Sequence, residues 1–175
     1  MEDFTGNKAL EDEIGYSFTN KQILVEARTH SSFSHENGGR DNSNLAHLGD
    51  AVLTLVILDR FYDIEDLRPG LCDRIKQTLV SNQALGNFAL EKRLGEKYLI
   101  MGVGGKEQKH YESIDALAAF VEAIIGAVFR DAGYEGYAEA KKVVESWILK
   151  SQYEKFPMIK EMIVPDKKAN GQSQP

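Results

Sequence analysis

The sequence predicts an all-α domain, and three observations support this fold class. No segment alternates apolar and polar residues over any length, as a half-buried strand would. Apolar residues recur instead at helical spacing, while Gly, Pro and short polar residues stand where helices begin and end. The 175 residues, 42% of them apolar, are enough for one domain with a substantial core.

Boundary signals place the expected helices in order along the chain. Gly15 ends one, Asn20 caps the next, and Pro69 suits a first turn because its missing N–H costs nothing there. The helices are expected over residues 8–14, 21–27, 43–62, 69–80, 82–93, 111–132 and 137–150, with a short one after Pro157. We expect loops over 31–44 and 95–110, and a disordered tail over 165–175.

Composition narrows the class of protein. Cys72 is the only cysteine, which excludes an internal disulfide and a cysteine-built zinc site. The acidic start has no signal-peptide pattern, and the longest apolar run, 51–58, is far below the ~20 residues of a membrane helix. We therefore expect a cytoplasmic protein without a membrane partner.

The charge excludes a generally basic nucleic-acid binder. Lys and Arg number 21 against 27 Asp and Glu, giving a net charge of −6. A polyanion must therefore be held by local basic patches, or by metal ions placed between carboxylates and phosphate.

Two acids lie inside the most apolar predicted helices. Neither Asp50 nor Glu122 has a lysine or arginine one helical turn away. A buried carboxylate without a partner must take up a proton or lose several kcal/mol. A shared magnesium or manganese ion explains both acids and could position water against a phosphodiester. The alternatives are that each helix reaches the surface at its acid, or that each acid caps a neighbouring helix.

Around these acids the chain resembles the catalytic domain of ribonuclease III, a family of helical nucleases acting on double-stranded RNA. Five motifs in the family's order carry the resemblance, which spans about residues 10 to 150. They are Ile14-Gly15-Tyr16-Ser17-Phe18, Thr29-His30-Ser31-Ser32-Phe33, Leu48-Gly49-Asp50-Ala51-Val52-Leu53, Thr78-Leu79-Val80-Ser81 and Glu122-Ala123-Ile124-Ile125-Gly126-Ala127.

The resemblance implies two of the family's four active-site acids. Asp50 and Glu122 match them as catalytic residues and metal ligands, whereas Ala46 and Ala119 stand where the other two are expected. A further assisting acid would fall near Pro69. The mini-ribonuclease III branch, whose members are nucleases, is similar in keeping one aspartate and one glutamate. The two alanines fit natural loss and deliberate substitution equally.

Asp115 is the candidate third metal ligand. It precedes Glu122 by seven residues, almost two helical turns, so both acids could share one helix face. The alternative is a structural acid in the first turn of its helix, where the helix dipole favours negative charge.

Other residues have weaker signals. His30, His35, His47 and His110 have no spacing typical of a zinc site or catalytic triad. His47 stands where the family has an aromatic residue that fills a socket of the partner subunit, so we interpret it as an interface or core residue. Lys106, Lys109 and His110 form the best basic patch for RNA, although a solvated surface explains them equally well. The glycines of 102–106 lack phosphate-loop spacing and indicate a turn.

The resemblance therefore implies a ribonuclease III-like endonuclease domain over 1–150 that works as a homodimer. Residues 151–175 would be a short, partly disordered extension, too short for the family's double-stranded-RNA-binding domain. The expected activity is magnesium-dependent, or manganese-dependent, hydrolysis of double-stranded or structured RNA in RNA processing. The alternatives are a catalytically impaired dimeric RNA-binding or ribosome-assembly module, and a hydrolase of small phosphate compounds.

Overall fold

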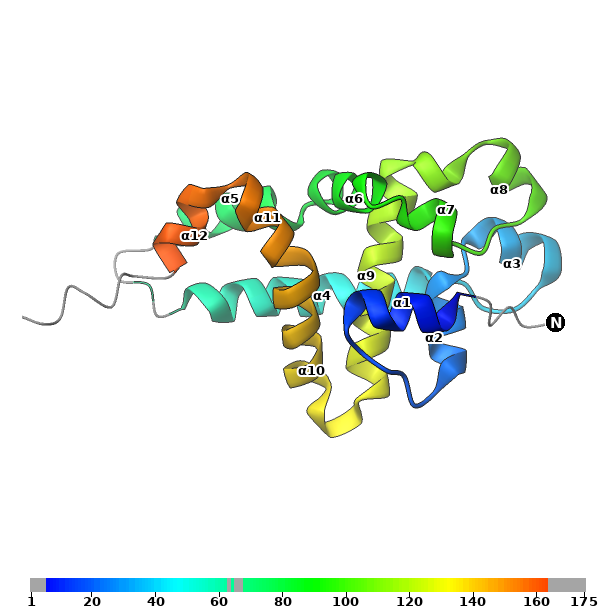
Figure 1. Ribbon diagram of the computed structural model, residues 1–175, viewed down its shortest axis with the longest axis horizontal. Helices are drawn as coiled ribbons and strands as arrows, with labels where there is room; N and C mark the ends of the chain where they lie inside the picture. Colours follow the sequence, from blue (N-terminus) through cyan, green and yellow to red (C-terminus); the bar gives the residue numbers. More distant parts are fainter. Residues whose placement is uncertain (1–5, 63, 65–67, 164–175) are drawn as a thin grey trace, which may run out of the picture.

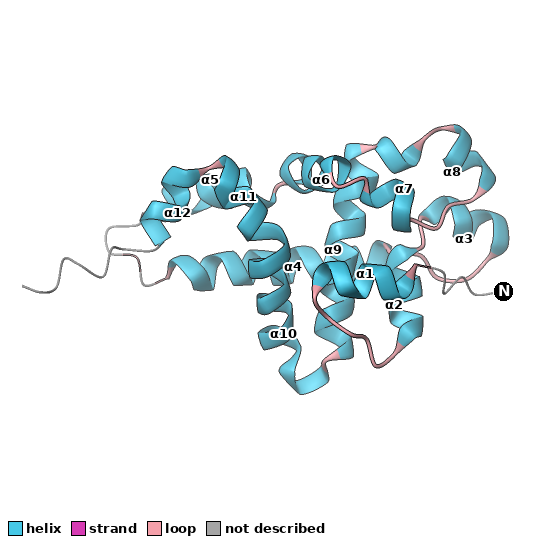
Figure 2. Ribbon diagram, in the orientation of Figure 1, coloured by secondary structure: helices cyan, strands magenta, loops and turns pink. Residues whose placement is uncertain are grey.

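The computed structural model describes residues 6–62, 64 and 68–163. Within these residues all regular structure is helical, and the one sheet-like feature is an isolated parallel bridge between Thr29 and Ile100 (Figure 2). The predicted all-α class is confirmed. The tail predicted over 165–175 lies outside the described residues. No helix within them is both long and apolar enough to cross a membrane.

The helices follow one another with short connections (Figure 1). In chain order they are α1 (Asn7–Ile14), α2 (Lys21–Arg28), α3 (Ser31–Asn37), α4 (Ser43–Phe61), α5 (Pro69–Val80), α6 (Asn82–Glu91), α7 (Leu94–Tyr98), α8 (Val103–Glu107), the 3₁₀ turn η1 (His110–Glu112), α9 (Ile114–Asp131), the 3₁₀ turn η2 (Gly133–Glu135), α10 (Gly136–Val143), the π-helix η3 (Val144–Leu149), α11 (Lys150–Lys155) and α12 (Pro157–Ile163).

The core is built around α9, which packs against α2, α4, α6 and α10. Figure 1 shows α9 crossing α4 near the middle of the molecule. Ten residues of α9 between Leu117 and Val128 are buried, because apolar residues occupy nearly every side of this helix. A helix that is apolar all round needs neighbours on all sides, and the shorter helices supply them.

Several helix ends lie where the sequence predicts them. Gly15 adopts a left-handed conformation with φ of 75° and ends α1. The Asn20 side chain accepts a hydrogen bond from Gln22 N–H at the start of α2, and that of Ser81 accepts one from Ala84 N–H at the start of α6. Pro69 opens α5.

The loop predicted over 31–44 is wrong in its first half, where α3 forms. His30 Nδ1 accepts a hydrogen bond from Ser32 N–H, which caps α3. The Glu36 carboxylate then accepts from the N–H groups of Val103 and Gly104, at 2.8 and 3.0 Å, at the start of α8. Polar residues favour loops, but here tertiary hydrogen bonds between two short helices stabilise the helical form.

The loop predicted over 95–110 is also wrong in part, because it contains most of α7 and all of α8. The long helix expected from residue 111 begins at Ile114, where the Ser113 side chain caps it. The helix expected to end near Lys150 continues instead through η3 into α11. Gln152 in α11 is buried and donates a hydrogen bond to the Ala84 carbonyl of α6.

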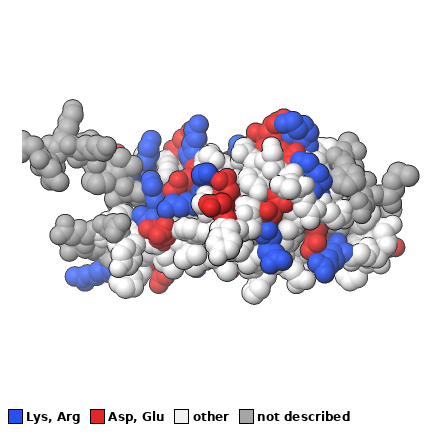
Figure 3. All heavy atoms as spheres, turned by 90° about the horizontal axis from the view of Figure 1, so that it is seen from below, with Lys and Arg blue, Asp and Glu red and all other residues white. Residues whose placement is uncertain are grey.

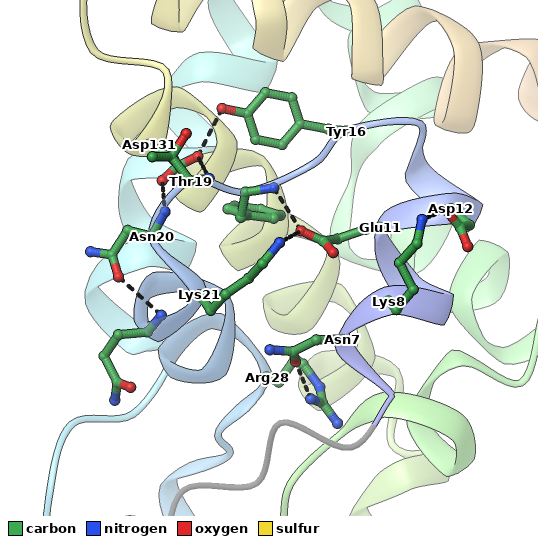
Figure 4. A network of polar contacts seen from close by, with 12 residues as sticks. Asn7, Lys8, Glu11, Asp12, Tyr16, Thr19, Asn20, Lys21, Arg28 and Asp131 are labelled. Carbon is green, nitrogen blue, oxygen red and sulfur yellow. Dashed lines mark hydrogen bonds and ion pairs between the residues drawn. The ribbon is translucent and has the colours of Figure 1, made fainter.

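Polar contacts hold the N-terminal segment against the C-terminal end of α9 (Figure 4). The Asp131 carboxylate accepts hydrogen bonds from the Tyr16 hydroxyl and from the N–H groups of Thr19 and Asn20, all within 2.9 Å. Glu11 accepts from Phe18 N–H at 2.7 Å and pairs with Lys21. These contacts fix the orientation of α9 relative to α1 and α2.

Candidate active site

Two glycines let α4 and α9 approach to backbone contact. A Cβ atom on Gly49 would lie 1.8 Å from the Glu122 carbonyl oxygen, and one on Gly126 would lie 2.1 Å from the Leu45 carbonyl oxygen. Since no other residue fits at such distances, these two positions determine how closely the helices cross. The crossing places Asp50, which follows Gly49, beside the turn of α9 that contains Glu122.

The two predicted acids lie near each other at this crossing, in different environments. Asp50 is exposed, whereas Glu122 is partly buried. Burial, followed by the negative charge of Asp50, raises the pKa of Glu122 to about 7. The expectation that both acids are buried is therefore wrong for Asp50, because α4 reaches the surface there.

No lysine or arginine neutralises this pair among the residues that the structure describes. None of the ion pairs between described residues includes Asp50 or Glu122. Negative charge is therefore concentrated at the crossing without a protein cation to offset it. Carboxylate oxygens in this arrangement are the donors that magnesium and manganese prefer.

The structure does not bring Asp115 into this pair. It lies exposed in the first turn of α9, and no three His, Cys, Asp or Glu side chains gather into a metal-binding group in the described part of the chain. Ala46 and Ala119 lie one turn before Asp50 and Glu122 respectively, so the two positions contribute methyl groups and no ligands.

A lysine near the acids was missed by the sequence analysis. Lys76 of α5 is partly buried, and its Nζ donates a hydrogen bond of 3.4 Å to the Thr54 hydroxyl. Thr54 lies one turn after Asp50 on α4, so Lys76 contacts α4 about one helical turn from this acid without forming an ion pair with it. Only the packing of α5 on α4 reveals this, since no spacing in the sequence connects residues 76 and 50.

The predicted basic patch is divided between two environments. Lys106 and Lys109 are exposed at the end of α8 and just after it. The His110 ring lies 5.0 Å from that of His30, centroid to centroid, and its Nδ1 is buried without a hydrogen-bond partner among the described residues. The two histidines that seem unrelated in sequence are thus neighbours, and His110 is less available to a ligand than the two lysines.

His47 is exposed, so it is not a core residue. It begins a stripe of exposed residues on α4 and its C-cap, at spacings of four, four, three and four: His47, Ala51, Leu55, Leu58 and Tyr62. Leu55, Leu58 and Tyr62 are 52%, 43% and 84% exposed, which leaves an apolar face of α4 uncovered. We call these five residues the α4 stripe.

Figure 3 shows that lysine and arginine side chains alternate with aspartate and glutamate on the face that it displays. No single sign of charge dominates this face, in keeping with the net charge of −6. A polyanion contacting it would therefore meet local cations and not a continuous basic surface.

Comparisons with known proteins identify the family of this chain. A family model described as "Ribonuclease-III-like" matches residues 20–152. The chain belongs to the ribonuclease III family. It is 36% identical over 140 residues to Ribonuclease 3 of Chlamydia muridarum and 35% identical over 151 residues to that of Pseudomonas fluorescens strain SBW25. These alignments cover 78% and 86% of the chain but 59% and 62% of the relatives, so the chain spans about three fifths of their length.

Solved structures confirm the fold at the family level. A nuclease-domain structure of ribonuclease III from Campylobacter jejuni superimposes with a TM-score of 0.72 at 30% identity, covering 85% of this chain and 96% of that one. A second structure of this domain, at 2.2 Å resolution, gives 0.71 at 28% identity, covering 88% and 98%. The predicted ribonuclease III-like helical fold is therefore confirmed.

Proposed function

We propose that this chain is a metal-dependent endoribonuclease that hydrolyses phosphodiester bonds in double-stranded or structured RNA. The observation that carries the proposal is the meeting of Asp50 and Glu122 at the α4–α9 crossing with no cation paired to them in the described part of the chain. The curated relatives are named Ribonuclease 3, and the family match covers the elements that bear both acids.

The donor set fits a magnesium or manganese ion. Two carboxylates supply hard oxygen ligands, and burial, followed by the charge of Asp50, raises the pKa of Glu122, so a bound cation would favour its ionised form. Asp50 and Glu122 would hold the ion, with the remaining positions taken by water and phosphate oxygens. When bound, such an ion supplies positive charge to the phosphodiester and lowers the pKa of an attacking water.

The remaining groups of the site would act on the RNA backbone. Lys76, beside Thr54, places a positive charge within reach of a phosphate held near Asp50. Lys106 and Lys109 are proposed as further phosphate contacts, with His110 at their edge. Contacts to phosphate carry no sequence information, so recognition would depend on the shape of an A-form duplex. Asp115 remains a predicted third ligand, although its first-turn position favours a structural role.

We also propose that two copies of the chain pair through the α4 stripe. An apolar face repeated along one helix suits a symmetric contact, in which the same surface of each copy meets the other. The description of one Campylobacter jejuni structure refers to a region involved in dimer formation, which supports pairing as a property of that nuclease domain. Pairing would cover Leu55, Leu58 and Tyr62 and bring two acidic pairs into one assembly.

The rival function is a dimeric RNA-binding or ribosome-assembly module with impaired catalysis. Two observations favour it: Ala46 and Ala119 supply no ligands, and no third acidic group joins the pair among the described residues. Such a module would bind duplex RNA through the same lysines but leave it intact.

Cleavage of long double-stranded RNA by the purified chain separates these functions. With magnesium or manganese, wild type should cut, whereas Asp50→Asn and Glu122→Gln should each lose at least about 100-fold in rate, because removing one of two protein ligands weakens the metal site. The exposed Glu135→Gln is the matched control and should cut like wild type. Asp115→Asn tests the third ligand.

Three outcomes would decide against the proposal. Duplex RNA that is bound but uncut with both metals would establish the rival module. Turnover of mononucleotides with indifference to duplex RNA would indicate a hydrolase of small phosphate compounds. Equal cleavage by wild type and both acid variants would place the chemistry elsewhere.

A further inference from the structure

Two histidines lie together where α3 meets α8. The rings of His30 and His110 are 5.0 Å apart, centroid to centroid, and both residues are partly buried. His30 directly precedes α3, and its N–H donates to the Ile100 carbonyl, whereas His110 opens η1, just after α8. A change in the charge of either ring would therefore act where several short segments meet.

Two residues of α3 hold α8 in place, and we call their contacts the α3–α8 junction. Ser32 Oγ accepts a hydrogen bond from Gly102 N–H at 3.2 Å, and the Glu36 carboxylate accepts from the first two N–H groups of α8. The packing is close, because a Cβ atom on Gly105 would lie 2.3 Å from Ser32 Oγ. Helices of seven and five residues are marginal alone, so α3 and α8 both depend on this junction.

The junction depends on an uncharged His30. The Nδ1 atom of this ring accepts a hydrogen bond from Ser32 N–H at 3.1 Å, which caps α3, and lies 2.9 Å from Ser32 Oγ. In a charged imidazole both nitrogens carry a hydrogen, so Nδ1 can no longer accept from Ser32 N–H. Protonation of His30 would therefore remove the cap of α3 at the residue that also contacts α8.

The surroundings of His30 disfavour its charged form. Burial, followed by the neighbouring His110, lowers the pKa of His30, while the Asp41 carboxylate raises it to a smaller extent. His110 Nε2 lies 3.2 Å from Gln108 Oε1, and its Nδ1 is buried without a hydrogen-bond partner in the described part of the chain. The ring of His110 thus supplies no hydrogen bond that would stabilise a protonated His30.

The carboxylates near His30 keep their charge in the range where histidine titrates. Hydrogen bonds from the start of α8 lower the pKa of Glu36, and hydrogen bonds from Ser43 lower the pKa of Asp41, so both stay ionised. Lys106 of α8 adds a positive charge near Glu36, and the exposed His35 of α3 acts on Asp41. His30 is therefore the titratable group whose proton competes directly with a hydrogen bond of the junction.

We propose that His30 and His110 form a pH switch, in which protonation of His30 releases α3 from α8. A released His30 has the ordinary pKa of a histidine and binds a proton more readily than the docked one. The docked form should therefore lose stability as the pH falls below about 6.5. The switch involves neither Asp50 nor Glu122, so it does not depend on the proposed nuclease activity.

Hydrogen exchange of the backbone amides at pH 5 and pH 7, followed by NMR, tests the switch. In wild type we expect the protection factors of the Val103 and Gly104 amides to fall about tenfold from pH 7 to pH 5, while the His30 ring titrates over the same range. His30→Asn keeps a side-chain acceptor at the N-cap but cannot titrate, so its protection should not change with pH. His30→Ala lacks the acceptor and should have low protection at both pH values.

Two further variants separate the histidines. His110→Gln removes one cause of the lowered pKa of His30, so the fall in protection should be smaller than in wild type. His35→Gln is the matched control, since His35 is exposed on α3, and it should respond like wild type. Amides of α9 in the same samples report on unfolding of the whole chain, and their protection should not fall at pH 5.

Three results would overturn the inference. The first is equal protection of the Val103 and Gly104 amides at pH 5 and pH 7 in wild type. The second is a fall in His30→Asn as large as that in wild type. The third is an equal loss of protection in α9, which would show that acid unfolds the whole chain and not this junction.

Discussion

At the scale of single residues, the unusual group is Glu122. A glutamate loses its proton near pH 4.5 when solvated, but partial burial beside Asp50 raises the pKa of Glu122 to about 7. The ionised Glu122 carboxylate therefore destabilises the folded chain when no metal is bound. The same negative charge is available to bind a cation. Asp50, which is exposed, supplies the second carboxylate at lower cost.

The raised pKa of Glu122 predicts how stability depends on pH in the absence of metal. Between about pH 4.5 and 7 the folded chain holds a proton that the unfolded chain has lost. The free energy of unfolding should therefore fall as the pH rises, by up to about 1.4 kcal/mol per unit, and the fall should end above pH 7. Urea denaturation of wild type and Glu122→Gln at pH 5 to 8 measures this contribution as their difference.

In this comparison Asp50→Asn is the matched variant, since it removes the second cause of the shift and leaves Glu122 in place. In Asp50→Asn, the fall in the free energy of unfolding that Glu122 causes should end at a lower pH than in wild type. Parallel pH profiles for wild type and Glu122→Gln would show that Glu122 titrates normally and would contradict the structure.

The sequence predicts the identity of the acids but not their surroundings. Asp50 and Glu122 stand out because each interrupts an apolar helix without a neighbouring cation. Their proximity depends on how α4 crosses α9, and the position of Lys76 depends on how α5 packs on α4. Neither packing is encoded in local spacing, so a lysine 26 residues from Asp50 could not be found from the sequence.

At the scale of elements, the α4–α9 crossing determines the site. Gly49→Ala would force a Cβ into the Glu122 carbonyl, so we expect a loss of at least about 1–3 kcal/mol in the free energy of unfolding. Gly70→Ala is the matched control, because nothing lies within 4 Å of its Cβ and it stands in α5. That variant should be neutral or more stable by up to about 1 kcal/mol.

Chemical denaturation of Gly49→Ala and Gly70→Ala measures the difference between their free energies of unfolding. If Gly49→Ala were as stable as Gly70→Ala, the helices would be further apart than the structure has them. The acids would then have no fixed separation, and a shared ion would lose its support.

Helix boundaries could be predicted where one residue determines them. Helices begin or end as expected at four residues that act through their own backbone or side chain: Gly15, Asn20, Pro69 and Ser81. By contrast, α3 depends on Glu36 reaching α8, a contact across 67 residues. The π-helix η3 likewise has no local signal in the sequence.

At the scale of the whole molecule, the α4 stripe predicts association. Leu58→Lys places a charge in the middle of the apolar face, and we expect the dimer to weaken by at least about tenfold, since a buried unpaired charge is costly. Leu90→Lys is the matched control: Leu90 is 40% exposed on α6, close to the 43% of Leu58, but lies outside the stripe. Sedimentation velocity over a range of concentrations measures the dimer dissociation constant of each variant.

Cleavage should follow association. If a duplex needs both copies, Leu58→Lys should lose RNA cleavage in proportion to the monomer fraction, and higher protein concentration should restore it. A wild-type chain that stays monomeric at all concentrations, or a Leu58→Lys variant that dimerises like Leu90→Lys, would contradict pairing through the α4 stripe.

The most direct test of the account is a crystal of the chain soaked in manganese and examined by anomalous scattering. One peak should lie between the carboxylates of Asp50 and Glu122 in wild type, and it should be absent from Glu122→Gln crystals treated in the same way. A soaked wild-type crystal with no peak there, or one in which a lysine or arginine occupies the space between the two acids, would contradict the proposed chemistry while leaving the family membership intact.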